Sequence, residues 1–306
     1  MANQDLSRLV LGLAQLGMAY GIANTNGQPS LRTAEKIIQA SWENGIREFD
    51  TAQGYGESEQ ILGTILQKLG LSKSARVISK PHPDLNSLNV DAHFQVLSRS
   101  LERLQCSTIY GYLLHREDLL DFWAKGLGRI LNDFVKLGLV RHVGISVYTP
   151  ERALEALKCD GVDLLQVPTS ILDHRFEKAG VFELARELGK KVYVRSVFLQ
   201  GLAILPTKDI PETLRFALPI LEKLDFVAYE YGLSRNELAL GYVKNAHPHA
   251  KVILGVEHPI QILENVTLWK KEYPWEIVER ARSEFGDLDE TILNPSLWPK
   301  GTTAQL

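Results

Sequence analysis

Four side chains of this chain could together move a proton: Asp50, Tyr55, Lys80 and His115. Tyr55 follows Asp50 by five positions, in a turn with two glycines that let the backbone bend sharply. A tyrosine titrates near ~10, so it is a poor acid or base at neutral pH unless burial and a nearby cation change its pKa. Lys80, paired with Asp50, could lower the pKa of this phenol, and His115 could donate a hydrogen bond beside it. We therefore predict a proton-transfer site made of these four residues.

The four residues lie in or next to short apolar segments, which alternate with segments whose apolar residues have a helical period. The predicted strands are 10–13, 47–50, 76–80, 109–115, 142–147, 164–168, 191–196 and 251–255. The predicted helices are 31–44, 58–69, 89–104, 124–137, 150–158, 177–188, 213–231 and 259–268. Two helices carry N-cap signals, Ser58 before Glu59 and Thr149 before Pro150. Eight strand–helix pairs in 306 residues predict an α/β fold, an eight-stranded parallel β/α (TIM) barrel.

Polar residues end most of the predicted strands. In a parallel barrel these ends meet on one face, where the active sites of such folds lie. Asp50, Lys80 and His115 end the second, third and fourth strands. The later strands end with Ser146, Gln166, Arg195 followed by Ser196, and Gly255. Because polar residues repeated around the ring do not serve packing, the pattern predicts a pocket on this face.

A doubly wound open sheet is the main alternative fold. Such nucleotide-binding sheets carry a Gly-x-Gly-x-x-Gly turn after the first strand, and the glycines near the first strand here have the wrong spacing. No linker rich in Pro, Gly or Ser divides the chain. We therefore expect a single domain over residues 1–306, with a barrel core at about 9–270 and a C-terminal tail at 271–306.

Composition and charge exclude several classes of protein. With a net charge of −3 and a pI of about 6.3, the chain lacks the basic surface of a nucleic-acid binder. No segment approaches the ~18 uncharged apolar residues of a membrane span. Two cysteines are too few for a disulfide framework, so we expect a reducing, cytoplasmic location. His247 and His249 have no nearby acidic or cysteine partner, and we predict no metal site.

Lys80 has an alternative use as a nucleophile. A lysine at a strand end can be desolvated and form a Schiff base, as in barrel aldolases. Pairing with Asp50 would keep Lys80 charged, which opposes that chemistry. The chain also has no Gly-x-Ser-x-Gly turn that would indicate a serine hydrolase.

Four segments resemble the signature of the aldo-keto reductases. They are residues 45–63 (GIREFDTAQGYGESEQILG), 113–116 (LLHR), 138–146 (GLVRHVGIS) and 262–265 (ILEN). The similarity runs in the right order over roughly residues 9–270 and suggests a bacterial-type, D-threo-aldose dehydrogenase-like branch. It implies an eight-stranded barrel that binds an extended nicotinamide dinucleotide without a Rossmann fold. The activity it implies is the interconversion of an aldehyde, ketone or sugar and its alcohol.

The resemblance also implies roles for individual residues. Tyr55 would protonate the carbonyl oxygen as hydride arrives from the nicotinamide. Asp50 and Lys80 would tune that phenol, while His115 would orient the carbonyl. The implied cofactor contacts are Asp50, Ser146 and Gln166 near the nicotinamide, Ser196, Phe198 and Gln200 along the pyrophosphate, and Gly255, Glu264 and Asn265 at the adenosine end.

The chain departs from the family pattern at three places. Val147 stands where many members have Asn, so one hydrogen bond to the carboxamide is lost or replaced. Arg195 stands where an aromatic residue stacks on the nicotinamide; it could lie flat against that ring, or reach the pyrophosphate or an anionic substrate. The loop 255–261, with Glu257 and Gln261 as expected cofactor contacts, has no Lys or Arg to bind a 2′-phosphate. NADP(H) and NAD(H) are therefore both open as the cofactor.

An alternative to the enzyme is a cofactor-binding regulatory or sensor subunit with little turnover, and the complete tetrad favours the enzyme. The expected partner is a small carbonyl or alcohol substrate, and a mixed polar and aromatic rim suits a sugar or polyol-like carbonyl. The expected rim residues are Met18, Tyr20, His82, Arg116, Phe198 and Trp298. We expect a monomer.

Overall fold

The computed structural model of the protein describes residues 6–85 and 88–299. Its strands close into one barrel in chain order, and every neighbouring pair is parallel. The strands are β1 (Leu9–Gly12), β2 (Glu48–Asp50), β3 (Arg76–Ser79), β4 (Ile109–Leu114), β5 (Val140–Ser146), β6 (Leu164–Pro168), β7 (Lys191–Arg195) and β8 (Lys251–Gly255). The predicted eight-stranded β/α barrel is confirmed, with small shifts at the strand ends.

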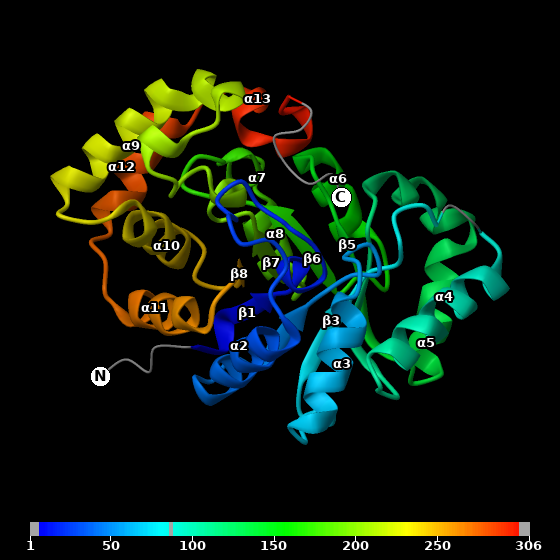
Figure 1. The fold of residues 1–306 in the computed structure, drawn as a ribbon. Coiled ribbons are helices and arrows are strands. Elements are labelled where there is room, and N and C mark those ends of the chain that lie inside the picture. The colour runs from blue at the N-terminus through cyan, green and yellow to red at the C-terminus, as the bar shows by residue number, and fades with distance from the viewer. Residues whose placement is uncertain (1–5, 86–87, 300–306) are drawn as a thin grey trace.

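Helices surround the strands and cover the outer face of the barrel (Figure 1). They are α1 (Ala14–Gly17), α2 (Leu31–Glu43), α3 (Ser58–Lys68), α4 (Val90–Arg103), α5 (Gly128–Lys136), α6 (Pro150–Lys158), α7 (Arg175–Lys178), α8 (Val181–Glu187), α9 (Leu218–Glu230), α10 (Arg235–Ala246), α11 (Pro259–Lys270), α12 (Glu276–Phe285) and α13 (Glu290–Leu293). α11 packs against α2, so the last helix of the barrel lies beside the first long one. Within the described residues, no helix has the length and apolarity to span a bilayer.

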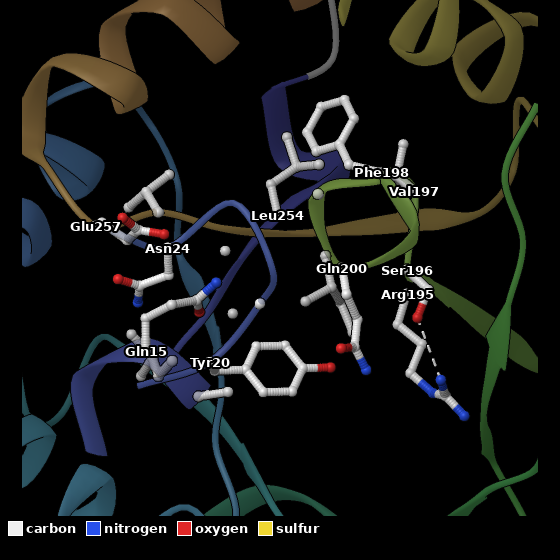
Figure 2. A pocket seen from close by; sticks show the side chains of 18 of the residues that line it. Gln15, Tyr20, Asn24, Arg195, Ser196, Val197, Phe198, Gln200, Leu254 and Glu257 are labelled. Carbon is white, nitrogen blue, oxygen red and sulfur yellow. Dashed lines mark hydrogen bonds between the residues drawn. The ribbon is translucent and has the colours of Figure 1, made fainter. Parts of the chain in front are cut away.

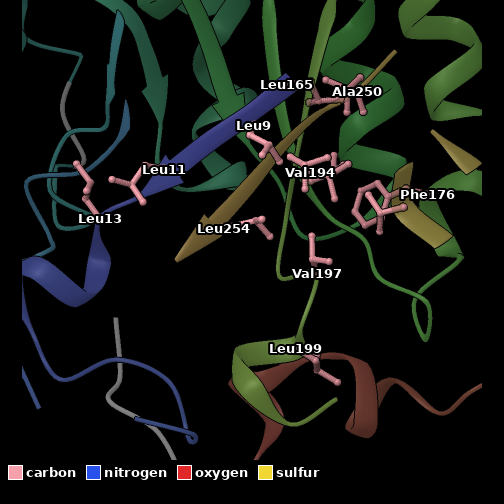
Figure 3. Close-up of a cluster of buried hydrophobic side chains, with 14 of the residues drawn as sticks. Leu9, Leu11, Leu13, Leu165, Phe176, Val194, Val197, Leu199, Ala250 and Leu254 are labelled. Carbon is pink, nitrogen blue, oxygen red and sulfur yellow. The ribbon is translucent and has the colours of Figure 1, made fainter. Parts of the chain in front are cut away.

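Alternating side chains of each strand separate the barrel interior from the layer under the helices. In β1, Val10 belongs to the interior cluster, whereas Leu9 and Leu11 pack outward. Figure 3 shows outward-facing side chains of this kind, with those of β1, β6 and β7 among them. The interior cluster consists of Val10, Ile78, Leu113, Leu164, Tyr193 and Ile253.

This alternation positions the polar residues at the carboxyl ends of the strands. Residues two positions apart share a face of a strand, so a residue two places after an interior side chain also points into the barrel. In five strands an interior residue is followed, two positions later, by a residue at or next to the strand end. The followers are Lys80 after Ile78, His115 after Leu113, Gln166 after Leu164, Arg195 after Tyr193, and Gly255 after Ile253. The interior packing of the strands therefore directs these followers toward one barrel mouth.

The opposite end of the barrel is closed by a buried polar network. Glu48 is 2% exposed and accepts a hydrogen bond of 2.8 Å from the Tyr193 hydroxyl. Lys251 donates to the other oxygen of the same carboxylate at 2.9 Å. Because Glu48 is held at this end, Asp50 is the carboxylate of β2 that faces the pocket.

Two helix predictions differ from the structure. The sequence prediction lacks α10, whose residues are all buried from Leu238 to Val243, and such a continuous apolar run hides the helical period. The capping box of Ser234 with Glu237 is the signal that could have revealed it. The predicted helix 177–188 is instead α7 followed by α8, because Gly180 between them has a φ of 74°.

The N-cap prediction at Ser58 is wrong. Ser58 lies inside α3 and its hydroxyl donates to the Leu13 carbonyl oxygen at 2.9 Å, while it accepts from the Thr51 hydroxyl at 2.8 Å. The side chain therefore links α3 to the ends of β1 and β2. At the other expected cap, Pro150 does begin α6, but the Thr149 side chain makes no capping hydrogen bond.

The predicted tail 271–306 contains α12 and α13, and α12 packs against α10. Residues 300–306 lie outside the described part of the chain. The predicted helix 124–137 also begins differently, as a π-helical turn at Trp123–Leu127 that leads into α5. Gly126 in this turn has a φ of 125°, which breaks the regular helix.

Candidate active site

Asp50 and Lys80 form a buried ion pair at the carboxyl ends of β2 and β3. Lys80 Nζ lies 2.8 Å and 2.9 Å from the two Asp50 oxygens and donates a third bond of 3.0 Å to the Thr51 carbonyl oxygen. Lys80 is fully buried and Asp50 is 4% exposed. Since these three bonds use all the donors of the ammonium group, Lys80 is held as a fixed cation rather than a free amine. The geometry opposes a Schiff-base role for Lys80.

Tyr55 lies against this ion pair. Lys80 Nζ is 5.2 Å from the centroid of the Tyr55 ring, and the His115 ring meets that ring edge to face with centroids 5.8 Å apart. The turn that carries Tyr55 requires glycine at position 56, which has a φ of 53°. A Cβ at Gly56 would also lie 2.3 Å from the Gly17 carbonyl oxygen. The structure thus brings together all four residues of the predicted tetrad.

The pKa of Tyr55 differs from the sequence expectation. Burial raises the pKa of the phenol above its ordinary value because the phenolate would be poorly solvated, and the Asp50 carboxylate acts in the same direction. The Arg195 guanidinium opposes this rise. Lys80, which is fully bonded to Asp50 and Thr51, is not the cation that lowers it. The expected lowering by Lys80 is therefore wrong for this arrangement, and Tyr55 is a protonated phenol at neutral pH.

His115 is a neutral imidazole in this site. Burial is the main reason that its pKa falls from 6.5 to about 3, and the positive charge of Lys80 lowers it further. Its Nδ1 is buried and has no hydrogen-bond partner among the described residues. A neutral imidazole next to Tyr55 can donate or accept one hydrogen bond without adding charge.

A pocket opens beside this tetrad and extends from β2 across β7 to β8. Ten of the predicted catalytic and cofactor-binding residues line it: Asp50, Tyr55, Gln166, Arg195, Ser196, Phe198, Gln200, Gly255, Glu257 and Gln261. Ser146 is buried next to Gln166, its register partner on β6. Gln166 donates a hydrogen bond of 2.9 Å to Asp50, which connects the tetrad to the β6 wall.

The loop after β7 has an unusual backbone. Ser196, Leu199 and Gln200 have φ values of 62°, 49° and 54°, a left-handed region that such residues seldom adopt. Backbone strain of this kind is concentrated at ligand-binding sites. Gln200 Oε1 is buried without a hydrogen-bond partner among the described residues, although its residue lines the pocket. The loop therefore offers a ligand an unpaired acceptor.

The segment between β1 and α2 forms a second wall, which the sequence analysis assigned only in part. Gln15, Tyr20 and Asn24 line the pocket, and of these only Tyr20 was expected near the mouth. The Ile22 amide donates to the Gln200 carbonyl oxygen at 2.9 Å, so this segment is joined to the β7 loop. Figure 2 shows the Tyr20 phenol pointing toward the side chains of Gln200 and Arg195. No motif marks this wall, because its residues contribute as a folded loop.

The far end of the pocket lies between β8 and α11. A Cβ at Gly255 would lie 2.4 Å from Gln15 Nε2, so a larger residue there would displace the end of the Gln15 side chain. Gln261 Oε1 accepts from the Glu257 amide at 2.7 Å and from the amide of the N-cap residue His258 at 3.0 Å, and the second bond caps α11. Burial raises the pKa of the Glu257 carboxyl above its ordinary value.

Two predicted adenosine contacts lie apart from this pocket. Glu264 is exposed on α11 and is not among the lining residues. Asn265 lines a separate, much smaller cavity under β1 and β8. The structure brings neither residue to the pocket wall, because both lie beyond the first turn of α11.

Only some of the residues expected at the rim of the barrel mouth line the pocket. Tyr20 and Phe198 line the pocket, but Trp298 is packed in the core and donates to the Ile292 carbonyl oxygen at 3.4 Å. Arg116 is bound to Asp118 and to the Pro83 carbonyl oxygen. Among the described residues there is no cluster of His, Cys, Asp or Glu that could hold a metal ion.

Comparisons with known proteins agree with this geometry. The sequence matches the model of the Aldo/keto reductase family over residues 8–283. It is 26% identical to 6-dehydroglucose reductase from Novosphingobium aromaticivorans, over 89% of this chain and 94% of that protein. It is also 26% identical to NADH-specific methylglyoxal reductase from Escherichia coli, over 85% of this chain and 89% of that protein. The fold is similar to that of aldo-keto reductase AKR11C1 from Bacillus halodurans in its holo form, with a TM-score of 0.73, 24% identity, and coverage of 90% of this chain and 91% of that chain.

Proposed function

The chain belongs to the aldo/keto reductase family, and on this premise we propose that it interconverts a small carbonyl compound and its alcohol with Tyr55 as general acid and base. Family membership makes the protein an oxidoreductase that uses NADP(H) or NAD(H). The roles of individual residues and the choice of substrate and cofactor are the parts that we propose here.

One observation carries the proposal. Tyr55 is 8% exposed, lines the pocket, and is packed between the Asp50–Lys80 ion pair and the His115 ring. Its raised pKa keeps the phenol protonated, which suits a group that must deliver a proton during reduction. A purely structural tyrosine at this barrel mouth would not require a buried charge pair and an imidazole with an unpartnered nitrogen beside it.

The pocket lining fits a nicotinamide dinucleotide. When bound in reduced form, that cofactor supplies a hydride ion to the carbonyl carbon. Gln166 and Ser146 would hold its carboxamide, and the strained loop with Ser196 and Gln200 would hold its pyrophosphate. The Gln200 side-chain amide N–H can donate to a pyrophosphate oxygen, whereas its buried, unpartnered Oε1 needs a donor, which a ribose hydroxyl of the dinucleotide would supply.

Each member of the tetrad has a separate task in reduction. Tyr55 donates its proton to the carbonyl oxygen, so that the alcohol leaves neutral. Neutral His115 gives a hydrogen bond to the same oxygen and orients it. Asp50 and Lys80 fix the position of the phenol and, as a neutral pair, add little net charge to the pocket. In oxidation the step is reversed: Tyr55 must first lose its own proton to solvent, and the resulting phenolate accepts the proton of the alcohol, so the raised pKa favours reduction at neutral pH.

We propose that the protein prefers NAD(H) to NADP(H). Arg195 is the only Lys or Arg among the described residues that line the pocket, and it lies at the end near Tyr55. At the other end Glu257 faces the space, and a carboxylate repels a 2′-phosphate but accepts hydrogen bonds from free ribose hydroxyls. This assignment rests on local charge, and the sequence alone left both cofactors open.

The proposal is tested with the purified protein in two steps. Quenching of tryptophan fluorescence gives Kd for NADH and NADPH, and loss of absorbance of the reduced cofactor measures turnover with aldoses, sugar derivatives and aromatic aldehydes. Submicromolar binding with carbonyl-dependent oxidation supports the proposal. Tight binding without turnover would instead favour a sensor or regulatory subunit, and no binding would contradict the proposed cofactor. Turnover of unfunctionalised aromatic aldehydes alone would remove sugars as the expected substrates.

A further inference from the structure

Arg195 is the unpaired cation of the pocket. No carboxylate of the described residues lies within ion-pair distance of its guanidinium group. The nearby cations are already neutralised: Lys80 by Asp50, and Arg116 by Asp118. A buried or half-buried charge without a counterion is costly, so its presence at a ligand-binding surface indicates that a ligand supplies the counterion.

The contacts of Arg195 hold the guanidinium group but leave much of its donor capacity free. The group lies over the Tyr148 ring, 4.4 Å from its centroid. It donates to the Val147 carbonyl oxygen and to the Ser196 hydroxyl, both at the long distance of 3.3 Å. An arginine stacked on an aromatic face keeps its edge available for a planar, two-point contact with an anion.

The position of Arg195 relates it to the reacting end of the pocket. Its charge lowers the pKa of both Tyr55 and His115, which places the guanidinium group within electrostatic reach of the phenol and the imidazole. Arg195 also acts on the phenol of Tyr20, on the wall opposite β7. When the carbonyl group of a substrate lies next to Tyr55, the rest of the substrate therefore lies near the Arg195 guanidinium group.

We propose that Arg195 binds an anionic group of the carbonyl substrate, a carboxylate or a phosphate, so that the enzyme selects acidic aldehydes or ketones over neutral ones of the same shape. This inference rests on the proposed function. Tyr148 keeps the guanidinium plane in place, and Tyr20 lines the pocket beside it. Arg195 acts as a specificity residue, since reduction itself requires only the tetrad.

Matched substrate pairs test this proposal. The carboxylate pair is 4-carboxybenzaldehyde and 4-formylbenzamide, and the phosphate pair is glyceraldehyde 3-phosphate and glyceraldehyde. We expect kcat/KM at least tenfold higher for the anionic member of one pair in the wild-type enzyme, and which pair responds distinguishes the carboxylate from the phosphate. In Arg195→Met this ratio falls to near one, whereas Arg195→Lys keeps part of it. Arg116→Met is the control and leaves the ratio unchanged, because Arg116 is already bound to Asp118 and Pro83.

The affinity for the dinucleotide distinguishes substrate binding by Arg195 from the alternative, in which Arg195 binds the cofactor. We expect Arg195→Met to change Kd for the reduced cofactor by less than threefold, while kcat/KM falls much more for the anionic member of the responding pair than for its neutral member. A loss of dinucleotide binding with an unchanged substrate ratio would show that Arg195 serves the pyrophosphate or the nicotinamide, and would overturn the inference while the proposed function stands. If the wild-type enzyme reduces no carbonyl compound, the proposed function fails and the inference fails with it.

Discussion

Gln166 on β6 donates a hydrogen bond of 2.9 Å to Oδ1 of Asp50 on β2, across the barrel mouth. The same oxygen accepts from Lys80 at 2.8 Å. One N–H of the Gln166 amide is therefore committed to the tetrad, while its Oε1 accepts no hydrogen bond from the described residues. The residue that we assign to the nicotinamide carboxamide thus also fixes the carboxylate that holds Lys80.

Changes at Gln166 should affect binding and catalysis together. Gln166→Met keeps the size of the side chain but removes the hydrogen bond to Asp50 and the one proposed to the carboxamide. A hydrogen bond to a charged group contributes about 1.5 to 3 kcal/mol. We expect Kd for the reduced dinucleotide to rise about tenfold and kcat to fall several-fold, measured by fluorescence titration and steady-state kinetics. Gln53→Met is a control, because Gln53 binds Ser100 and Val96 outside the pocket. An unchanged Kd in Gln166→Met would argue against its cofactor role.

The pH profile of reduction tests the ionisation of Tyr55. Burial and Asp50 raise the pKa of the phenol above its ordinary value of 10, so the proton donor remains present as the pH rises. We expect kcat for reduction to stay level between pH 7 and about 10. If Lys80 instead lowered this pKa, the rate would decline with a midpoint between about pH 7 and 9. Such a decline, absent from the profile of Tyr55→Phe, would contradict the raised pKa.

Cofactor preference should depend on Glu257. Glu257→Lys replaces repulsion of the 2′-phosphate by attraction, and we expect the ratio of Kd for NADPH to Kd for NADH to fall at least tenfold; Glu257→Gln gives an intermediate ratio. Burial raises the pKa of Glu257, so it takes up a proton on acidification and the wild-type preference for NADH weakens as the pH falls. Glu276→Gln, an exposed change on α12, is the control. If the ratio of the two Kd values is the same in all variants, the Glu257 carboxylate does not determine the preference for NADH.

Stability at low pH should depend on His247, which is 3% exposed and stacks on Phe182 with ring centroids 3.9 Å apart. Burial lowers its pKa from 6.5 to about 4. Between these values the unfolded chain binds a proton that the folded chain does not, so the free energy of unfolding decreases as the pH falls from 6.5 to 4, by up to about 3 kcal/mol. Urea titrations at both pH values measure this decrease. It should be smaller in His247→Phe, and an equal decrease would assign the acid sensitivity to other groups.

Three residues of the tetrad could be predicted from the sequence because strand periodicity places them, whereas Tyr55 lies in the turn after β2 and was predicted from that turn and the family resemblance. Asp50, Lys80 and His115 each end an apolar strand, and closure of the barrel brings such ends together. The direction of the Tyr55 pKa shift could not be predicted in the same way. The pKa of Tyr55 depends on how completely the phenol is buried and on the fact that Lys80 spends its donors on Asp50 and Thr51.

The residues of the pocket walls were less predictable than those at the strand ends. Gln15 and Asn24 lie in a segment whose sequence has no helical or strand period, and the segment takes its position from the β7 loop through the bond from Ile22 to Gln200. Glu264, which the family resemblance placed at the adenosine end, is exposed on α11 and does not line this pocket, so its contact with a cofactor stays a prediction. Long-range loop packing of this kind leaves no short-range signal in a sequence.

Comparison of Tyr55→Phe with the wild-type enzyme tests the central claim most directly. The variant removes one hydroxyl from a buried ring and keeps its packing between Lys80 and His115. With a carbonyl substrate that the wild type reduces, we expect kcat to fall by at least about a thousandfold while Kd for the reduced dinucleotide changes less than threefold. Loss of cofactor binding would make Tyr55 a structural residue of the pocket. Turnover close to that of the wild type would contradict its role as the proton donor.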